Sequence, residues 1–130
     1  EEDRKALDAP KDYAILSGGN IFFVMEDDDP VGTVAMVPVM AGSSQTESVF
    51  ELAKMAVRPD KRGKGYGSLL VNRCISFARE KNAKEIMLVT NDVLKPALAL
   101  YQRAGFKKVF EYSDSRYERG NLEMRLRLGG

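Results

Sequence analysis

The sequence contains no histidine and no tryptophan, and its 130 residues include a single cysteine, Cys74. Without histidine, a Ser-His-Asp or Cys-His catalytic arrangement and an imidazole zinc ligand are excluded. One cysteine excludes an internal disulfide and any CxxC redox or metal pair. Proton transfer near neutral pH must therefore use Glu, Asp, Lys, Tyr, Cys or water.

Long apolar runs are also missing. No run approaches the roughly 18 residues that a membrane span needs, and the acidic start Glu1-Glu2-Asp3 does not have the pattern of a signal peptide. We therefore expect a soluble, cytoplasmic protein with no membrane partner. Apolar residues make up 44% of the chain, so residues 1–130 are expected to form a single domain whose core needs no metal or disulfide.

The net charge of +1 hides an asymmetry between two parts of the chain. Residues 1–56 contain 4 basic and 11 acidic side chains, giving −7, whereas residues 57–130 contain 16 and 8, giving +8. The basic part favours an anionic ligand or nucleic acid, and a solvated basic face is the alternative. A nucleic-acid-binding module needs basic residues spread over a face with stacking aromatics. The densest basic cluster lies in one loop instead, so no nucleic acid partner is expected.

Hydrophobic periodicity predicts a mixed α/β fold, with helices packed on a sheet. The expected strands lie at 21–25, 31–37, 49–57, 86–90, 106–112 and 122–128, the first two forming an antiparallel hairpin. The expected helices lie at 68–81 and 96–104, the second ended by Gly105. A helix end is expected at 1–8, and loops at 40–48 and 113–120.

Two reactive side chains lie on apolar faces of these elements. Strict alternation in the strand at 49–57 places Glu51 on one face with Val49, Ala53, Met55 and Val57. Cys74 lies on the apolar stripe of the helix at 68–81, where we expect an ordinary buried thiol rather than a nucleophile.

A glycine-rich basic loop links that strand to that helix. Gly63, Gly65 and Gly67 alternate, which removes Cβ atoms that would keep a ligand from the main chain and leaves N–H groups free at a helix N-terminus. Such N–H groups favour phosphate. Four cations strengthen this preference: Arg58, Lys61, Arg62 and Lys64. We therefore expect an anion site, with a glycine-rich turn as the alternative.

Spacing excludes two nucleotide-binding patterns for this loop. The dinucleotide pattern G-x-G-x-x-G needs a third glycine at Ser68. The Walker pattern needs Ser or Thr after Gly63-Lys64, where the sequence has Gly65. What remains is R-x-x-G-x-G after a strand that ends in Val57-Arg58-Pro59.

Two motifs resemble the acetyl-CoA-binding core of the GNAT N-acetyltransferases. The first is Arg62-x-x-Gly65-x-Gly67 after Val57-Arg58-Pro59, and the second is the segment ALALYQRAGF at 97–106. They match in order, separation and structural context, and the resemblance covers roughly residues 20–128. It implies a GNAT-like mixed, mostly antiparallel sheet with a splayed central parallel strand pair and flanking helices. Because only about 19 residues precede the hairpin, the family's first strand is expected to be missing.

The resemblance implies acetyl-CoA as the cosubstrate and no metal. In the family, the loop cradles the CoA pyrophosphate through main-chain N–H groups, and the pantetheine arm enters the gap between the splayed strands. The residues assigned to the cofactor in this way are Met55, Ala56, Val57, Arg62, Gly63, Lys64, Gly65, Tyr66 and Gly67. The family often has asparagine seven residues before the tyrosine of the second motif, where this sequence has Leu94. Asn91 either takes over that cofactor contact or caps the turn.

The resemblance implies acetyl transfer from acetyl-CoA to a primary amine of a small molecule or peptide, by direct attack in a ternary complex. Glu51 is the candidate base, directly or through water, with pairing to a lysine as the structural alternative. Tyr101 is the candidate acid for the departing thiolate, with core packing as its alternative. A main-chain N–H near Val57 would stabilise the oxyanion.

The alternative function is a non-catalytic acyl-CoA-binding or sensor domain, which would keep the loop but need neither Glu51 nor Tyr101. The resemblance also admits a homodimer. It does not identify the acceptor, and the acidic turn at 27–29 either contacts a cationic acceptor or is solvated.

Overall fold

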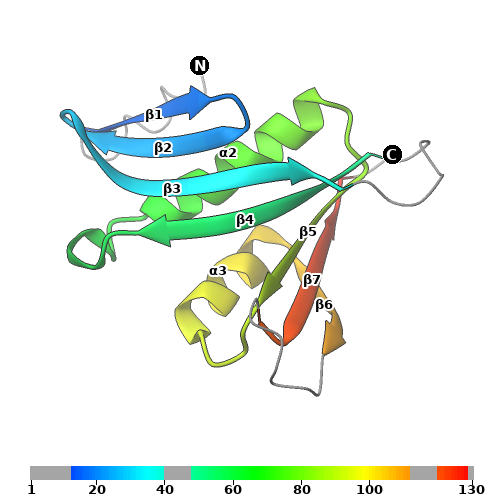
Figure 1. The fold of residues 1–130 in the computed structure, drawn as a ribbon. Helices are drawn as coiled ribbons and strands as arrows, with labels where there is room; N and C mark the ends of the chain where they lie inside the picture. The colour runs from blue at the N-terminus through cyan, green and yellow to red at the C-terminus, as the bar shows by residue number, and fades with distance from the viewer. Residues whose placement is uncertain (1–12, 40–47, 112–119, 129–130) are drawn as a thin grey trace.

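The computed structural model describes residues 13–39, 48–111 and 120–128, and these residues form one seven-stranded sheet with two α-helices (Figure 1). The strands are β1 Tyr13–Gly18, β2 Ile21–Glu26, β3 Asp29–Pro38, β4 Val49–Val57, β5 Glu85–Thr90, β6 Lys107–Glu111 and β7 Leu122–Arg127. The helices are α2 Tyr66–Glu80 and α3 Lys95–Ala104, and the 3-10 turn η1 spans Pro59–Lys61. The sheet order is β1-β2-β3-β4-β5-β7-β6, and only β4 and β5 pair in parallel. The predicted mixed, mostly antiparallel sheet is confirmed.

The strands and helices expected from periodicity differ from the observed ones by at most two residues at either end. Gly105, at φ +108°, ends α3 in the left-handed conformation that favours glycine. The helix end expected at 1–8 and nearly all of the two loops expected at 40–48 and 113–120 lie outside the described residues.

A strand that the periodicity did not indicate precedes the hairpin. β1 pairs antiparallel with β2 from Tyr13–Glu26 to Gly18–Ile21, and Gly19, at φ +74°, lies in the turn between them. This corrects the expectation of a missing first strand, because β1 fills the sheet edge beside β2 (Figure 1). Only Tyr13 of its six residues is buried, so the strand has no clear apolar alternation that the sequence could display.

The parallel strands β4 and β5 separate along their length. Their ladder contains the pairs Val49–Glu85, Phe50–Ile86 and Glu51–Met87. Beyond Glu51, β4 continues beside β3 and β5 continues beside β7, and the two strands diverge as a fork in Figure 1. The predicted splayed central pair is confirmed, and Glu51 lies at its last paired position.

A β-bulge in β4 changes which side chains share a face. Thr33 pairs with Ala56 but Ala35 pairs with Ala53, so β4 has one extra residue there, and Lys54 takes φ +56°. Met55 therefore lies on the same face of β4 as Leu52, and this face is turned toward the helices. The expectation that Met55 and Val57 share a face with Glu51 is corrected, because strict alternation fails at the bulge.

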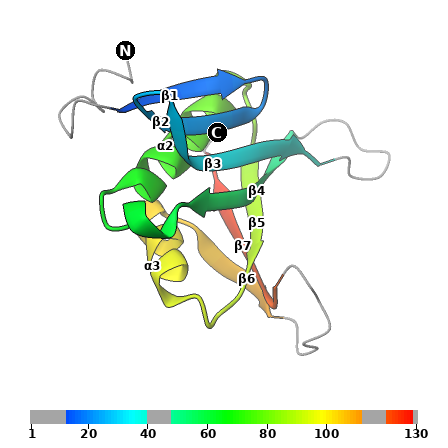
Figure 2. The same ribbon diagram turned by 60° about the vertical axis from the view of Figure 1, so that its left-hand side comes forward.

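The core lies between the sheet and α2. Its members with no exposed surface include Val24, Val34, Leu70, Cys74 and Met124. α2 packs against β2, β3 and β4, and α3 packs beside α2 (Figure 2). Across the described ranges, neither helix combines the length and apolar character that a bilayer crossing demands.

Candidate functional site

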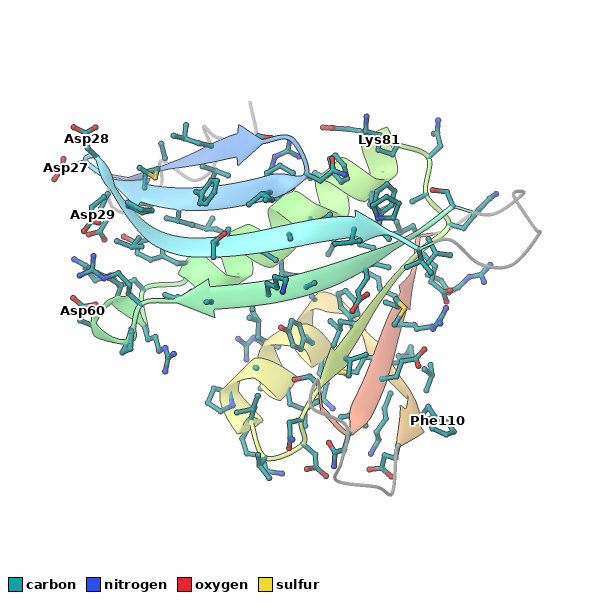
Figure 3. The ribbon with its side chains drawn as sticks, viewed as in Figure 1. Asp27, Asp28, Asp29, Asp60, Lys81 and Phe110 are labelled. Carbon is teal, nitrogen blue, oxygen red and sulfur yellow. The ribbon has the colours of Figure 1, made fainter. Side chains whose placement is uncertain are left out.

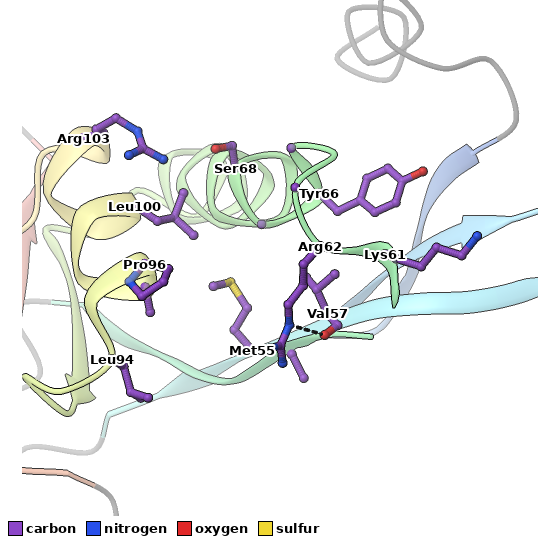
Figure 4. A pocket seen from close by; sticks show the side chains of 15 residues that line it. Met55, Val57, Lys61, Arg62, Tyr66, Ser68, Leu94, Pro96, Leu100 and Arg103 are labelled. Carbon is purple, nitrogen blue, oxygen red and sulfur yellow. Dashed lines mark hydrogen bonds between the residues drawn. The ribbon is translucent and has the colours of Figure 1, made fainter. Parts of the chain in front are cut away.

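A cavity of about 590 Å³ lies between β4, the glycine loop and α3 (Figure 4). β4 contributes Met55, Ala56 and Val57 to its wall. The loop and the start of α2 contribute Lys61, Arg62, Gly63, Gly65, Tyr66, Gly67 and Ser68. The opposite wall comes from Leu94, Pro96, Ala97, Leu100 and Arg103. The cavity therefore extends from the fork side of β4, across the loop, to the groove between α2 and α3.

The three loop glycines have different roles. Gly63 and Gly65 adopt φ +83° and +84°, a region that strains other residues, and a Cβ on either would meet open space. Gly67 has no such backbone constraint, but a Cβ there would lie 3.0 Å from Leu100 Cδ2 of α3. Two glycines therefore shape the loop, and the third lets α2 approach α3.

The start of α2 places main-chain N–H groups at the cavity wall. The first helical hydrogen bond runs from Leu69 N–H to the Gly65 carbonyl at 3.1 Å. The N–H groups of Tyr66, Gly67 and Ser68 precede it in the helix, where no intrahelical acceptor is available. All three residues line the cavity, so this wall is suited to bind an anion.

Glu26, at the end of β2, anchors the loop from outside the cavity. Its carboxylate accepts hydrogen bonds from Lys61 Nζ, at 2.7 Å, and from the hydroxyl of Tyr66, and it lies 3.7 Å from Lys64 Nζ. Its side chain is only 12% exposed. The hydrogen bonds from Lys61 and Tyr66 lower the pKa of Glu26 from its usual 4.5 to about 2. Glu26 carries no signal in the sequence that links it to the loop, because it lies 35 positions before Lys61.

Carboxylates also neutralise Arg58, the first cation of the loop. Its guanidinium contacts Asp29 at 2.5 Å and Asp60 at 3.0 Å. Asp29 and Asp60 lie at the same edge of the molecule in Figure 3. Arg62 donates from Nε to the Val57 carbonyl at 3.1 Å (Figure 4). Three of the four loop cations, Arg58, Lys61 and Lys64, are therefore paired with carboxylates, and part of the acidic turn contacts this loop.

Glu51 lies on the helix-free face of the sheet at the fork. Its neighbours in register are Val37 of β3 and Met87 of β5. The residue is partly buried, and its Oε2 atom has almost no contact with solvent. Arg125, paired with Met87 across the sheet, forms ion pairs with Glu85 at 2.8 Å and Glu123 at 2.7 Å. The same face also carries Arg127, paired in register with Glu85, and Lys107, paired in register with Arg125.

Tyr101 is buried beneath the cavity wall rather than in it. It is 7% exposed, and its ring packs edge-to-face on Phe106 with centroids 5.9 Å apart. Burial raises the pKa of Tyr101, and the Cys74 thiol acts in the same direction, so the phenol is protonated at neutral pH. Burial also raises the pKa of Cys74 to about 12, consistent with the expected buried, unreactive thiol.

Two residues assigned to the cofactor are not part of the cavity wall. Lys64 is directed to Glu26, as described above. The side-chain oxygen of Asn91 accepts a hydrogen bond from Val93 N–H at 3.1 Å, which is the turn-capping alternative. Contact of either residue with a cofactor stays a prediction.

The cavity also includes residues that motif matching missed. Ser68 directly follows the loop, and Pro96, Leu100 and Arg103 line one face of α3. Their spacing of four and three residues is typical of one helix face. This signal was present in the sequence, but it does not reveal which face of α3 meets α2. Among the residues that the structure describes, no group of three or more Cys, Asp or Glu side chains is arranged to hold a metal ion.

The sequence of this chain matches the Acetyltransferase (GNAT) family over residues 1–106. It is 34% identical to human N-acetyltransferase 8B over 102 residues, which cover 78% of this chain and 44% of that protein. It is 33% identical to an uncharacterised N-acetyltransferase of Methanocaldococcus jannaschii over 88 residues, covering 67% of this chain and 39% of that protein. The chain therefore spans less than half the length of these relatives.

Solved structures share the fold at low sequence identity. The NatC complex bound to Gag peptide and CoA aligns with a TM-score of 0.73 at 21% identity, covering 84% of this chain and 71% of that chain. The yncA protein of Salmonella typhimurium, solved with its cofactor acetyl-CoA, aligns with a TM-score of 0.70 at 19% identity, covering 99% and 70%.

Proposed function

This chain belongs to the GNAT acetyltransferase family, and on that premise we propose that it transfers the acetyl group of acetyl-CoA to a primary amine. The acceptor is a small molecule or a peptide, and the amine attacks the thioester directly in a ternary complex. The observation that carries the proposal is the cavity that joins the start of α2 to Met55, Ala56 and Val57, which lie in the part of β4 beyond its last pairing with β5.

The shape of the cavity supports one orientation of the cofactor. The pyrophosphate binds the N–H groups at the start of α2, where helix-terminal donors favour an anion. Pantetheine extends past Met55, Ala56 and Val57 toward the fork. The thioester then lies between the two strands, with the helices on one side of the sheet and Glu51 on the other.

Glu51 takes the proton of the attacking amine, directly or through water. An amine attacks only in its neutral form, and a lysine-like amine with a pKa of about 10.4 is mostly protonated at neutral pH. A carboxylate at the fork can accept that proton. On the same face, Glu85 and Glu123 are both ion-paired with Arg125, whereas Glu51 lies at the fork itself.

Tyr101 donates a proton to the departing thiolate in this proposal. The raised pKa of the phenol keeps it in the donor form. Tyr101 itself is not part of the cavity wall, although its neighbour Leu100 is, so its hydroxyl must reach the sulfur beside Leu100. A main-chain N–H near Val57, close to the bulge at Lys54, stabilises the oxyanion.

Peptide-bound acetyltransferases among the structural neighbours support a peptide acceptor as one class. The NatC structure contains Gag peptide, and an Arabidopsis thaliana Naa50 structure contains a bisubstrate analogue of CoA and a peptide. Both share only the fold with this chain, so the acceptor class is proposed at the level of an amine. Homodimer formation and a cytoplasmic location also stay predictions from the sequence.

The test is an acetyl-CoA-dependent activity screen against lysine peptides, N-terminal peptides, polyamines and amino acids. Mass spectrometry of the acceptor should show a single acetyl addition, with one equivalent of CoA released. EDTA should leave turnover unchanged, because the mechanism uses no metal. Tight binding of acetyl-CoA without turnover on any acceptor would favour the acyl-CoA sensor alternative. Failure to bind acetyl-CoA would reject both functions.

A further inference from the structure

The loop that joins β5 to α3, residues 91–94, forms one end of the cavity wall opposite β4. Its last residue, Leu94, lines the cavity together with Pro96 in the first turn of α3, across from Val57 (Figure 4). Among the described residues, the ladder between β4 and β5 ends at Glu51, so strand pairing does not join the two walls. The position of the loop therefore depends on contacts made elsewhere.

Side-chain burial contributes little to holding this loop. Val93 is 71% exposed and Leu94 is 51% exposed. The free energy of apolar burial scales with the area removed from water, so these two residues gain little of it. The loop is therefore held mainly through the hydrogen bonds of its main chain.

Three main-chain N–H groups of the loop have acceptors. Val93 N–H donates to Asn91 Oδ1 at 3.1 Å and Leu94 N–H donates to the Asn91 carbonyl at 3.0 Å, so both of these bonds stay within the loop. Asp92 N–H instead donates to the side-chain oxygen of Asn121 at 3.1 Å, and these two residues are 29 positions apart in the sequence. Of the three bonds, this one alone ties the loop to another part of the fold.

The segment just before β7 also packs on the end of β5, where the loop begins. Thr90, the last residue of β5, is only 6% exposed. Gly120 adopts φ +135°, and a Cβ there would lie 2.2 Å from the Thr90 carbonyl oxygen, so the two main chains pack directly against each other. Asn121 follows Gly120 and precedes β7. Its side-chain oxygen therefore reaches the loop from a backbone that is itself packed on β5.

We propose that Asn121 is a positioning residue for acetyl-CoA, because its hydrogen bond from Asp92 N–H holds the cavity wall that contains Leu94. The inference rests on the proposed function, in which pantetheine passes between this wall and the end of β4. Asn121 lies outside the set of residues that line the cavity, so it acts through the loop rather than on the cofactor. The diphosphate binds at the start of α2 instead. Loss of the hydrogen bond should therefore weaken the binding of pantetheine and leave the binding of the diphosphate unchanged.

The test compares acetyl-CoA with ADP, which has a diphosphate but no pantetheine, by isothermal titration calorimetry. Asn121→Leu keeps the approximate size of the side chain and removes the acceptor oxygen. The Kd for acetyl-CoA should rise about tenfold, as expected for one lost hydrogen bond that leaves a partly buried donor unpaired. The Kd for ADP should change less than about twofold, because the start of α2 is untouched. Asn121→Ala removes the same oxygen without the bulk of leucine and should give the same two results.

Two further variants check that the hydrogen bond is the cause. Asn121→Asp keeps an oxygen that can accept from Asp92 N–H, so the Kd for acetyl-CoA should stay within about threefold of the wild-type value. Asn20→Leu makes the same change as Asn121→Leu at an exposed position in the turn between β1 and β2. It should leave both affinities unchanged.

Three results would overturn the role of Asn121 while the wild-type protein still binds acetyl-CoA, so that the proposed function stands. These are an unchanged acetyl-CoA affinity in Asn121→Leu and Asn121→Ala, an equal loss of acetyl-CoA and ADP affinity, and a loss in Asn121→Asp as large as in Asn121→Leu. A wild-type protein that does not bind acetyl-CoA rejects the proposed function together with this inference. Because the ratio of the two affinities is internal to each variant, a general loss of stability does not imitate the expected result.

Discussion

Glu51 is the single residue on which the proposed proton transfer depends. Glu51→Gln removes the proton acceptor and keeps the size of the side chain, so kcat should fall about 100-fold while the KM for acetyl-CoA changes less than about threefold. The acidic limb of the pH–rate profile should disappear with the carboxylate. Steady-state kinetics across the pH range measures both effects.

A matched control for Glu51 lies on the same face of the sheet. Glu85→Gln removes a carboxylate that is held by Arg125 rather than placed at the fork. It should leave the pH–rate profile intact. An unchanged profile in Glu51→Gln as well would exclude the base role and leave deprotonation to water.

A variant of Tyr101 distinguishes a proton-donating role of this buried phenol from a role in core packing alone. Tyr101→Phe keeps the ring that packs on Phe106, so the free energy of unfolding should change by less than about 1 kcal/mol. Loss of the proton donor should lower kcat roughly 10- to 100-fold, with CoA affinity retained. Urea denaturation and single-turnover kinetics measure the two quantities. Full turnover in a stably folded variant would assign Tyr101 to packing alone.

At the scale of an element, the glycine loop depends on a carboxylate that belongs to a different strand. Because the folded-state pKa of Glu26, about 2, lies below its usual 4.5, ionised Glu26 stabilises the folded protein above pH 4.5. This contribution is lost as the pH falls from 4.5 toward 2. Glu26→Gln should therefore be less stable than the wild type above pH 5, and the difference should vanish near pH 2. Urea denaturation at a series of pH values measures it.

Asp28→Asn is the control for the Glu26 prediction, since Asp28 is an exposed acid on the same turn. Its stability profile should follow the wild type. Glu26→Gln should also raise the Kd for CoA several-fold, because Lys61 and Tyr66 lose the group that positions them at the cavity. A pH-independent stability difference would mean that ionisation of Glu26 does not hold the loop.

At the scale of the whole molecule, cofactor binding should stabilise the fold. The cavity joins β4, the loop, α2 and α3, so a ligand that fills it binds the folded chain and not the unfolded one. At 100 times its Kd, CoA should add about 2.7 kcal/mol to the free energy of unfolding and raise Tm by about 10 °C. Differential scanning fluorimetry with CoA measures this shift. AMP, which lacks the pyrophosphate and pantetheine, is the control, and an equal shift with AMP would argue against the proposed orientation of the cofactor.

The charge asymmetry between residues 1–56 and residues 57–130 is explained by ion pairs that form between these two parts in the folded protein. The acidic first part contributes Glu26 and Asp29 to the loop of the basic second part. Two contiguous acidic residues of the turn, Asp27 and Asp28, remain exposed beside them (Figure 3). In the folded protein, part of the positive charge of residues 57–130 is therefore paired with carboxylates of residues 1–56. The other cations at the cavity are available to a ligand.

Local patterns in the sequence were sufficient to predict most of the strands and helices and the glycine loop. Apolar periodicity located β2 to β7 and both helices, and of these only β6 has all of its residues exposed. The alternating glycines indicated a close approach of ligand to main chain, and Gly63 and Gly65 do adopt conformations that other residues avoid. β1 was missed because an edge strand with one buried residue carries no such pattern.

The sequence by itself determined the fold family, the loop, and the chemical types of the candidate groups, because these depend on short-range spacing. Only the tertiary structure decided which distant residues meet: Glu26 at the glycine loop, Asn121 at the loop between β5 and α3, and Glu51 at the fork. It also decided the faces of β4, where one extra residue at the bulge reverses the alternation beyond Ala53. The physical reason is that such contacts and irregularities arise from long-range strand pairing and helix packing, which no local period records.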